Sequence, residues 1–168
     1  SRTLMRTYAL DGHSPAEALR RVNEFILQDK GSPLFLSAFY AVLDTPTGRL
    51  TYANAGHNPP LWLRQATGEV EPLQARGILL GAFDGFVHDE RTCMLEPGDY
   101  VVFYTDGITE ARNAAGDFLD DEGLEAIVRS QAWSSAEELL AAIITTVDEF
   151  AAGLPQADDF TVVVLRKL

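Results

Sequence analysis

The chain reads Val101-Val102-Phe103-Tyr104-Thr105-Asp106-Gly107, an apolar, strand-like run that ends in an aspartate. A later stretch, Asp158-Asp159-Phe160-Thr161-Val162-Val163-Val164-Leu165, has the reverse order, with two aspartates before an apolar run. A carboxylate at a strand end is held on rigid backbone and opens toward solvent. That arrangement suits hard divalent cations such as Mg²⁺ and Mn²⁺, which take oxygen ligands. Because aspartate also commonly ends strands without binding anything, the two stretches predict either a shared metal site or two ordinary strand ends.

A helix is predicted near the start of the chain. Ser14-Pro15-Ala16-Glu17 is a capping box with proline at the first helical position. It predicts a helix from Pro15 to about Gln28. The apolar stripe of this helix is predicted to hold Leu19, Val22, Phe25 and Ile26.

The remaining elements predict an α+β fold. Residues 34–44 are apolar almost continuously, which predicts a strand covered on both faces. Further strands are predicted at residues 50–54, 59–64, 86–95, 100–104 and 160–165, and further helices at 122–129 and from Ser134 or Ser135 to Gly153. Most of the predicted strands follow one another along the chain, with predicted helices before and after them. This order of elements indicates two sheets packed face to face with helices on the outside.

Composition excludes several classes of protein. The net charge is −12, from 25 acidic and 13 basic residues, and no basic run occurs, so binding to nucleic acid or to anionic membranes is not expected. The apolar runs are far too short to span a membrane, and no signal-peptide pattern opens the chain. The single Cys93 excludes an intramolecular disulfide and fits a reducing compartment. A single soluble domain over residues 1–168, located in the cytoplasm, is expected.

Six segments in order carry a family resemblance. They are residues 14–19, 35–44, 48–60, 95–99, 105–113 and 158–161, which read SPAEAL, FLSAFYAVLD, GRLTYANAGHNPP, LEPGD, TDGITEARN and DDFT. The series resembles the SpoIIE/RsbU branch of the metal-dependent protein serine/threonine phosphatases, the PPM family. The resemblance implies a four-layer α-β-β-α sandwich with metal ions at one edge of the strands.

Two earlier acidic motifs of that family are not in the sequence: a Gly-Asp-x-x-Asp strand and an Asp-x-x-Gly-His-Gly turn. Asp11-Gly12-His13 has the wrong spacing and position to replace the turn. Residues 1–10 resemble the tail of the helix that follows it. The chain is therefore expected to be the C-terminal larger part of a phosphatase domain, incomplete at its N-terminus.

The sequence lacks the nucleophiles of covalent phosphatases. Asp99 stands where a Cys-x5-Arg loop starting at Cys93 needs arginine. Tyr104 stands where the Asp-x-Asp strand of haloacid-dehalogenase-type phosphatases needs aspartate. A metal-activated water remains: two cations lower the pKa of a shared water and hold the phosphoryl oxygens, so that hydroxide attacks phosphorus in line.

The resemblance also implies particular metal ligands. In the family, the Thr-Asp-Gly aspartate and the first acid of the Asp-Asp-x-Thr segment bind one of two Mn²⁺ or Mg²⁺ ions. These positions are Asp106 and Asp158. Gly107, next to Asp106, is also assigned to the metal site, and Asp159 is an outer-shell or alternative ligand. The bridging carboxylate and the second ion's ligands would lie on the missing motifs.

Three other positions have alternative interpretations. His57 is predicted either to orient substrate or act as an acid, or to be a turn histidine that bonds backbone. Arg112 is predicted either to bind phosphate bidentately or to be a solvated helix arginine paired with Glu110 or Asp117. Trp62 and Trp133 are expected to be packing groups rather than a recognition pair.

Two functions follow from this reading. The first is hydrolysis of phosphoserine or phosphothreonine on a protein. The resemblance implies a phosphorylated anti-sigma-factor antagonist as the substrate, in a bacterial partner-switching pathway downstream of a sensor or receiver domain. The alternative is a degenerate or truncated module that acts without catalysis in docking or dimerisation, including as a homodimer. Residues 1–168 alone are expected to be inactive in either case.

Overall fold

The computed structural model describes residues 12–28, 34–153 and 160–168. The chain forms two compact units. The N-terminal unit comprises Ser1–Pro59 and Gln74–Met94, and the C-terminal unit comprises Pro60–Leu73 and Leu95–Leu168. The prediction that residues 1–168 form one domain stays a prediction, and residues 1–10 lie outside the described part of the chain.

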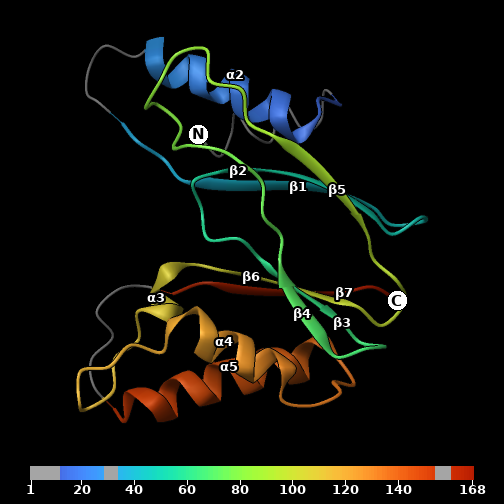
Figure 1. Cartoon of the computed structure of the whole chain (residues 1–168), viewed down its shortest axis with the longest axis vertical. Coiled ribbons are helices and arrows are strands. Elements are labelled where there is room, and N and C mark those ends of the chain that lie inside the picture. Colours follow the sequence, from blue (N-terminus) through green and yellow to red (C-terminus); the bar gives the residue numbers. More distant parts are fainter. Residues whose placement is uncertain (1–11, 29–33, 154–159) are drawn as a thin grey trace. The chain divides into compact units, whose positions relative to one another are not determined.

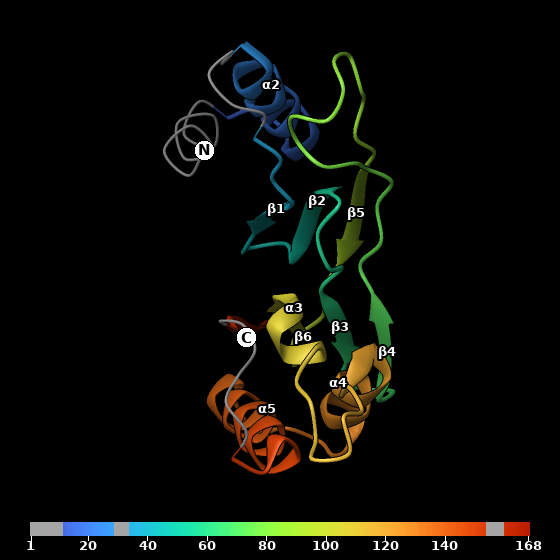
Figure 2. The same cartoon turned by 90° about the vertical axis from the view of Figure 1, so that its left-hand side faces the viewer.

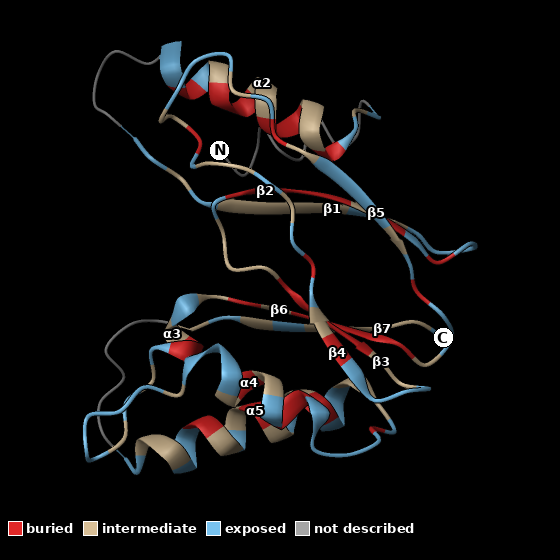
Figure 3. Cartoon of the chain, in the orientation of Figure 1, coloured by how far each residue is buried: buried red, intermediate tan, exposed pale blue. Residues whose placement is uncertain are grey.

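The N-terminal unit is a helix on a sheet (Figures 1 and 2). Its antiparallel sheet has the strand order β1-β2-β5, with β1 at Ala38–Asp44, β2 at Arg49–Ala55 and β5 at Glu90–Met94. Helix α2, at Pro15–Gln28, packs on one face of this sheet. Figure 3 shows the buried side of α2 turned toward the sheet, where Leu19 and Val22 contact a core that includes Ala53.

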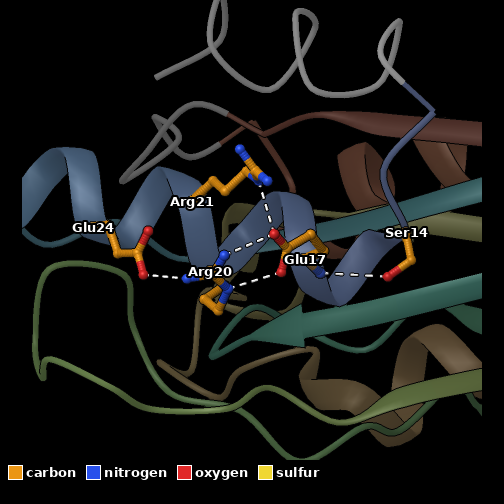
Figure 4. A network of polar contacts seen from close by, with 5 residues as sticks. All are labelled: Ser14, Glu17, Arg20, Arg21 and Glu24. Carbon is orange, nitrogen blue, oxygen red and sulfur yellow. Dashed lines mark hydrogen bonds and ion pairs between the residues drawn. The ribbon is translucent and has the colours of Figure 1, made fainter.

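The predicted bounds of α2 are confirmed. The Ser14 hydroxyl accepts a long hydrogen bond, 3.5 Å, from the Glu17 amide, and the Ser14 carbonyl accepts the first helical bond from Ala18. Figure 4 shows that the Glu17 carboxylate turns instead to Arg20 and Arg21, three and four residues later. The helix therefore has half of the predicted capping box, together with a network of ion pairs along its surface.

The predicted apolar stripe of α2 is wrong at one position. Leu19, Val22 and Ile26 are buried, but Phe25 is 52% exposed. A polar residue, Asn23, is buried instead, because its side chain donates to the Phe83 carbonyl and accepts from the Gly81 amide. These two bonds hold the loop before β5 against the helix.

The prediction that residues 34–44 form a strand covered on both faces is also wrong. Strand β1 begins at Ala38 and is an outer strand of the described sheet, with Val42 44% exposed. Leu34 and Phe35 are exposed and precede the strand, and Leu36 forms only an isolated bridge with Leu80. Apolar periodicity cannot separate a central strand from an outer strand of this composition.

The C-terminal unit is a four-stranded antiparallel sheet with helices on one face (Figure 1). The strand order is β4-β3-β6-β7. The bounds are β3 Leu61–Arg64, β4 Glu69–Pro72, β6 Tyr100–Tyr104, α3 Asp106–Thr109, α4 Asp120–Arg129, α5 Ala136–Ala151 and β7 Val162–Arg166. Helix α4 contacts β3 and β4, and α5 contacts β7, which gives this unit its own hydrophobic core.

Capping residues define the ends of α5 as predicted. The Ser135 hydroxyl accepts from the Glu138 amide at 3.1 Å, and the chain leaves the helix through Ala152 and Gly153, both with positive φ. The sequence did not predict β4 or α3. Each is four residues long and holds a single apolar residue other than glycine or proline, Val70 in β4 and Ile108 in α3, so no apolar pattern marks either element.

The buried carboxylate of Asp99 joins the turn that follows β3 to the turn that precedes β6. Asp99, 3% exposed, accepts from the indole of Trp62 at 3.0 Å and from the amides of Gln65 and Glu96. Trp62 and Trp133 are both buried, so their predicted packing role is confirmed. In the described ranges, none of the helices has the length and apolar composition of a membrane-spanning segment.

Candidate metal site

The candidate site lies where two neighbouring strands of the C-terminal sheet end. Strands β6 and β7 pair antiparallel, and Tyr104, the last residue of β6, lies opposite Val162, the first residue of β7. The end of one strand and the start of the other therefore meet at the same edge, as the sequence predicts for the segments that carry Asp106 and Asp158.

Thr105 extends this pairing by one step. Its amide donates to the Thr161 carbonyl at 3.1 Å, and its hydroxyl accepts from the Thr161 amide at 2.9 Å. The hydroxyl thus accepts the bond that the Thr105 carbonyl would take in a regular ladder. That carbonyl instead accepts from the Ile108 amide at 3.1 Å, which begins α3. This exchange of acceptors turns the chain from strand into helix immediately before Asp106.

Asp106 is the first residue of α3, and its side chain is exposed. Its carbonyl accepts from the Glu110 amide and from the Thr109 hydroxyl, so its backbone is held from within α3. Gly107 is the second residue of the same helix. Asp158 and Asp159 lie outside the described residues, so their approach to Asp106 stays a prediction.

The donor chemistry at this edge fits a hard cation only in part. Asp106 supplies carboxylate oxygens, the type of ligand that Mg²⁺ and Mn²⁺ take. Within residues 12–28, 34–153 and 160–168, no three or more His, Cys, Asp or Glu side chains are grouped so that they can hold a metal ion. A metal site at this edge therefore requires ligands beyond Asp106.

A buried tyrosine, Tyr104, links the same edge of the sheet to helix α4. The Tyr104 hydroxyl donates to a carboxylate oxygen of Asp121 at 2.9 Å, which joins the end of β6 to the first turn of α4. Burial, and then the bond to Asp121, raises the pKa of Tyr104 above its ordinary value. No local pattern in the sequence indicates this contact, because the two residues are 17 positions apart.

His57 lies in the N-terminal unit. Asn54 holds the backbone of His57 from both sides, since its side chain donates to the His57 carbonyl and accepts from the His57 amide, each at 2.8 Å. The ring Nδ1 lies 3.2 Å from the Ser37 hydroxyl. Among the described residues, the ring bonds the Ser37 side chain and no backbone group, and its part in catalysis or substrate binding stays a prediction. Ser37, the one polar break in residues 35–42, was not singled out from the sequence.

Arg112 is not on a helix, contrary to the alternative that placed it there. It forms an isolated β-bridge with Phe118, and its guanidinium lies 4.3 Å from the centroid of the Phe118 ring. Neither Glu110 nor Asp117, both described, forms an ion pair with it. The Phe118 ring thus contacts the guanidinium of Arg112, and the binding of Arg112 to substrate stays a prediction.

Comparison with solved structures gives the class of fold. The SiaA-PP2C domain of Pseudomonas aeruginosa superimposes with a TM-score of 0.83 at 20% identity, covering 98% of this chain and 66% of that chain. The RsbU and RsbW domains of Rv1364c from Mycobacterium tuberculosis give a TM-score of 0.75 at 26% identity, covering 99% of this chain and 45% of that chain. The fold is that of the PP2C phosphatases, so the predicted α+β class of the metal-dependent phosphatases is confirmed.

Sequence comparison gives the family. The family model for Stage II sporulation protein E (SpoIIE) matches residues 1–168, and the chain belongs to this family. The phosphoserine phosphatase RsbU of Bacillus subtilis (strain 168) is 31% identical over 97% of this chain. The chain spans about half, 50%, of the length of RsbU. The predicted membership of the SpoIIE/RsbU branch is confirmed.

Proposed function

We propose that this chain forms the larger part of a protein phosphatase that hydrolyses phosphoserine or phosphothreonine on a protein in the cytoplasm. Its membership of the SpoIIE family and its similarity to RsbU, a phosphoserine phosphatase by name, support the activity. The observation that carries the proposal is the pairing of Thr105 with Thr161, because it joins the two strand ends whose neighbouring aspartates would share a cation.

The proposed site assigns a role to each acidic residue at this edge. Asp106 and Asp158 hold one of two Mg²⁺ or Mn²⁺ ions, with Gly107 in the same turn and Asp159 as an outer-shell or alternative ligand. When bound, the ions supply an activated water and neutralise the phosphoryl oxygens. The turn at Thr105 fixes the backbone of Asp106 before a cation or substrate binds. Binding therefore costs little conformational entropy at Asp106.

The proposed substrate is a phosphorylated protein of the anti-sigma-factor-antagonist type, and the proposed regulator is an upstream sensor or receiver domain. One solved relative, from Mycobacterium tuberculosis, carries RsbU and RsbW domains in one chain. This combination supports a partner-switching role. His57 and Arg112 are proposed to contact the substrate: His57 has its backbone held by Asn54, and Arg112 stacks on Phe118.

The test compares Asp106→Asn with Asp148→Asn, a matched change at an exposed aspartate of α5. Both variants are made in a longer version of the chain that includes the two acidic motifs. Asp106→Asn is expected to reduce Mn²⁺-dependent release of phosphate from a phosphoserine protein by at least about a hundredfold, because a metal ligand is lost. Its thermal midpoint should stay within a few degrees of the parent, since the side chain is exposed.

Asp148→Asn should leave both quantities unchanged. Full activity of Asp106→Asn would remove Asp106 from the site. If the longer parent chain itself shows no phosphatase activity but folds, the result favours the alternative function, a module that acts in docking or dimerisation without catalysis.

A further inference from the structure

The N-terminal unit contains a cavity of about 380 Å³ that the proposed phosphatase site does not use. It is lined by Asn54, Pro59, Gln74, Ala75, Arg76 and Arg91, all of which belong to this unit. Two of these six residues are arginines, in a chain with a net charge of −12. The cavity therefore concentrates positive charge in a protein that is acidic overall.

Close backbone packing brings Arg76 to the cavity. The neighbouring Gly77 lies so near strand β2 that a Cβ on it would be 1.6 Å from the Asn54 carbonyl oxygen, so only glycine fits there. The Arg76 carbonyl accepts from the Asp89 amide at 2.9 Å, which ties this segment alongside the approach to β5. Arg91 follows two residues later, on β5 opposite Tyr52. Both arginines therefore reach the cavity from backbone that is tied to a neighbouring segment: Arg76 through its bond from Asp89, and Arg91 through the pairing of β5 with β2.

The charges of these arginines are weakly compensated. Within the described part of the chain, Arg91 makes one ion pair, with Asp89 at 3.4 Å, between side chains that are 59% and 38% exposed. Such exposed pairs contribute little. Arg76 forms no ion pair with any described residue, and its guanidinium lies 5.9 Å from the centroid of the Phe86 ring. By contrast, Arg20 and Arg21 of the same unit are bound by Glu17, with Glu24 also paired to Arg20.

The polar wall of the cavity also favours an anion. The side chain of Gln74 is exposed, and its amide nitrogen can donate hydrogen bonds. The side chain of Asn54 bonds the His57 backbone through both its oxygen and its nitrogen, which fixes its orientation in the wall. None of the six lining residues is acidic.

We propose that this cavity binds a phosphoryl group through Arg76 and Arg91. Guanidinium groups match the oxygens of phosphate in bidentate geometry. The two positive charges of Arg76 and Arg91 balance the two negative charges of a phosphate dianion, whereas a carboxylate would neutralise only one of the two arginines. The group can come from free inorganic phosphate or from a phosphorylated residue of a partner protein. The inference needs neither a metal ion nor Asp106, and so it does not depend on the proposed phosphatase activity.

The test is a titration followed by ¹H–¹⁵N NMR, with EDTA present and ionic strength held constant with chloride. The probes are inorganic phosphate, a phosphoserine peptide and the same peptide with glutamate in place of phosphoserine. Arg76→Gln and Arg91→Gln are each expected to weaken binding of the phosphoryl probes at least about tenfold, the effect of losing roughly 1.4 kcal/mol. Arg49→Gln, a matched change at an exposed arginine of β2 outside the cavity, should bind like the parent.

The three probes and a second pair of variants make the outcomes decisive. Tighter binding of the phosphoserine peptide than of phosphate identifies a phosphorylated residue as the source, and the reverse order identifies free phosphate. Arg76→Lys and Arg91→Lys keep the positive charge but lose the planar, bidentate donors of the guanidinium. These variants should therefore bind the phosphoryl probes more weakly than the parent, while their spectra without ligand stay like that of the parent. The proposal fails if neither phosphoryl probe shifts resonances at the cavity, if the glutamate peptide binds equally well, or if Arg49→Gln weakens binding as much as the cavity variants.

Discussion

Thr105 and Thr161 are joined by two hydrogen bonds, of which one uses a side chain in place of backbone. The Thr105 amide donates to the Thr161 carbonyl at 3.1 Å, and the Thr161 amide donates to the Thr105 hydroxyl at 2.9 Å. Because the hydroxyl takes this bond, the Thr105 carbonyl is free for Ile108 and α3 begins. A single hydroxyl therefore couples the β6–β7 ladder to the turn that carries Asp106.

Thr105→Val tests this coupling, since it removes the hydroxyl and keeps a β-branched side chain. We expect the free energy of unfolding to fall by about 1 kcal/mol and the Thr161 amide to exchange its hydrogen about fivefold faster. Hydrogen exchange measured by NMR, with urea unfolding alongside, checks both values. Thr105→Ser should restore them. Unchanged exchange at Thr161 in the valine variant would mean that the hydroxyl contributes nothing to the ladder.

Residues 1–168 alone, tested as the purified chain with saturating Mn²⁺, should release no measurable phosphate from a phosphorylated antagonist protein. Two-metal chemistry needs a carboxylate that bridges both ions, and Asp106 with Asp158 provides at most part of one ion's ligands. Bacillus subtilis RsbU serves as the positive control. Turnover comparable to that of RsbU would show that the missing ligands lie within this chain, and Asp11, His13 and Asp84 would be the first to mutate.

Asp99→Asn should be strongly destabilising, although Asp99 lies in a turn. The carboxylate is buried and accepts from three donors, and an asparagine in its place would direct its own N–H groups at some of them. We expect a loss of roughly 2–4 kcal/mol in unfolding free energy, measured by urea titration. Asp117→Asn, at an exposed position, is the matched control and should change stability by less than about 0.5 kcal/mol. Equal effects at the two positions would contradict the role of the buried bonds.

Glu17 should titrate well below the ordinary pKa of a glutamate. Hydrogen bonds from Arg20 and then Arg21 lower the pKa of Glu17 from 4.5 to about 2. Because the folded-state pKa lies below the unfolded value, the stability it contributes is present above about pH 4.5 and is lost as the pH falls toward 2. The contribution is small, under about 1 kcal/mol, since these side chains are partly exposed.

A ¹³C NMR titration of side-chain carboxyls measures this pKa directly. Arg20→Gln should move the Glu17 midpoint up toward 4.5, and Arg49→Gln, which leaves the network in Figure 4 intact, should not. A Glu17 midpoint near 4.5 in the parent chain would show that the network does not persist in solution.

Local patterns in the sequence determined several elements and part of the site. The bounds of α2, the Ser135 cap of α5 and the strand at Tyr100–Tyr104 follow from residues within a few positions of one another, so a capping box or a short apolar run suffices to predict them. The order of six short motifs likewise indicated the family that the comparisons show. The position of Asp106 at the end of a strand was visible in the same way.

Contacts between residues far apart in the sequence could not be predicted from local patterns and are seen only in the tertiary structure. Whether residues 34–44 form a central or an outer strand, and whether Asn23 in place of Phe25 is buried, depends on which segments pack alongside. Trp62 meets Asp99 across 37 positions, and Thr161 meets Thr105 across 56. The two arginines of the cavity carry no sequence signal at all, because Gly77 places Arg76 by an approach to Asn54 that no local pattern encodes. Side chains far apart in sequence are brought together by the pairing of strands and the packing of loops, and these are properties of the tertiary structure.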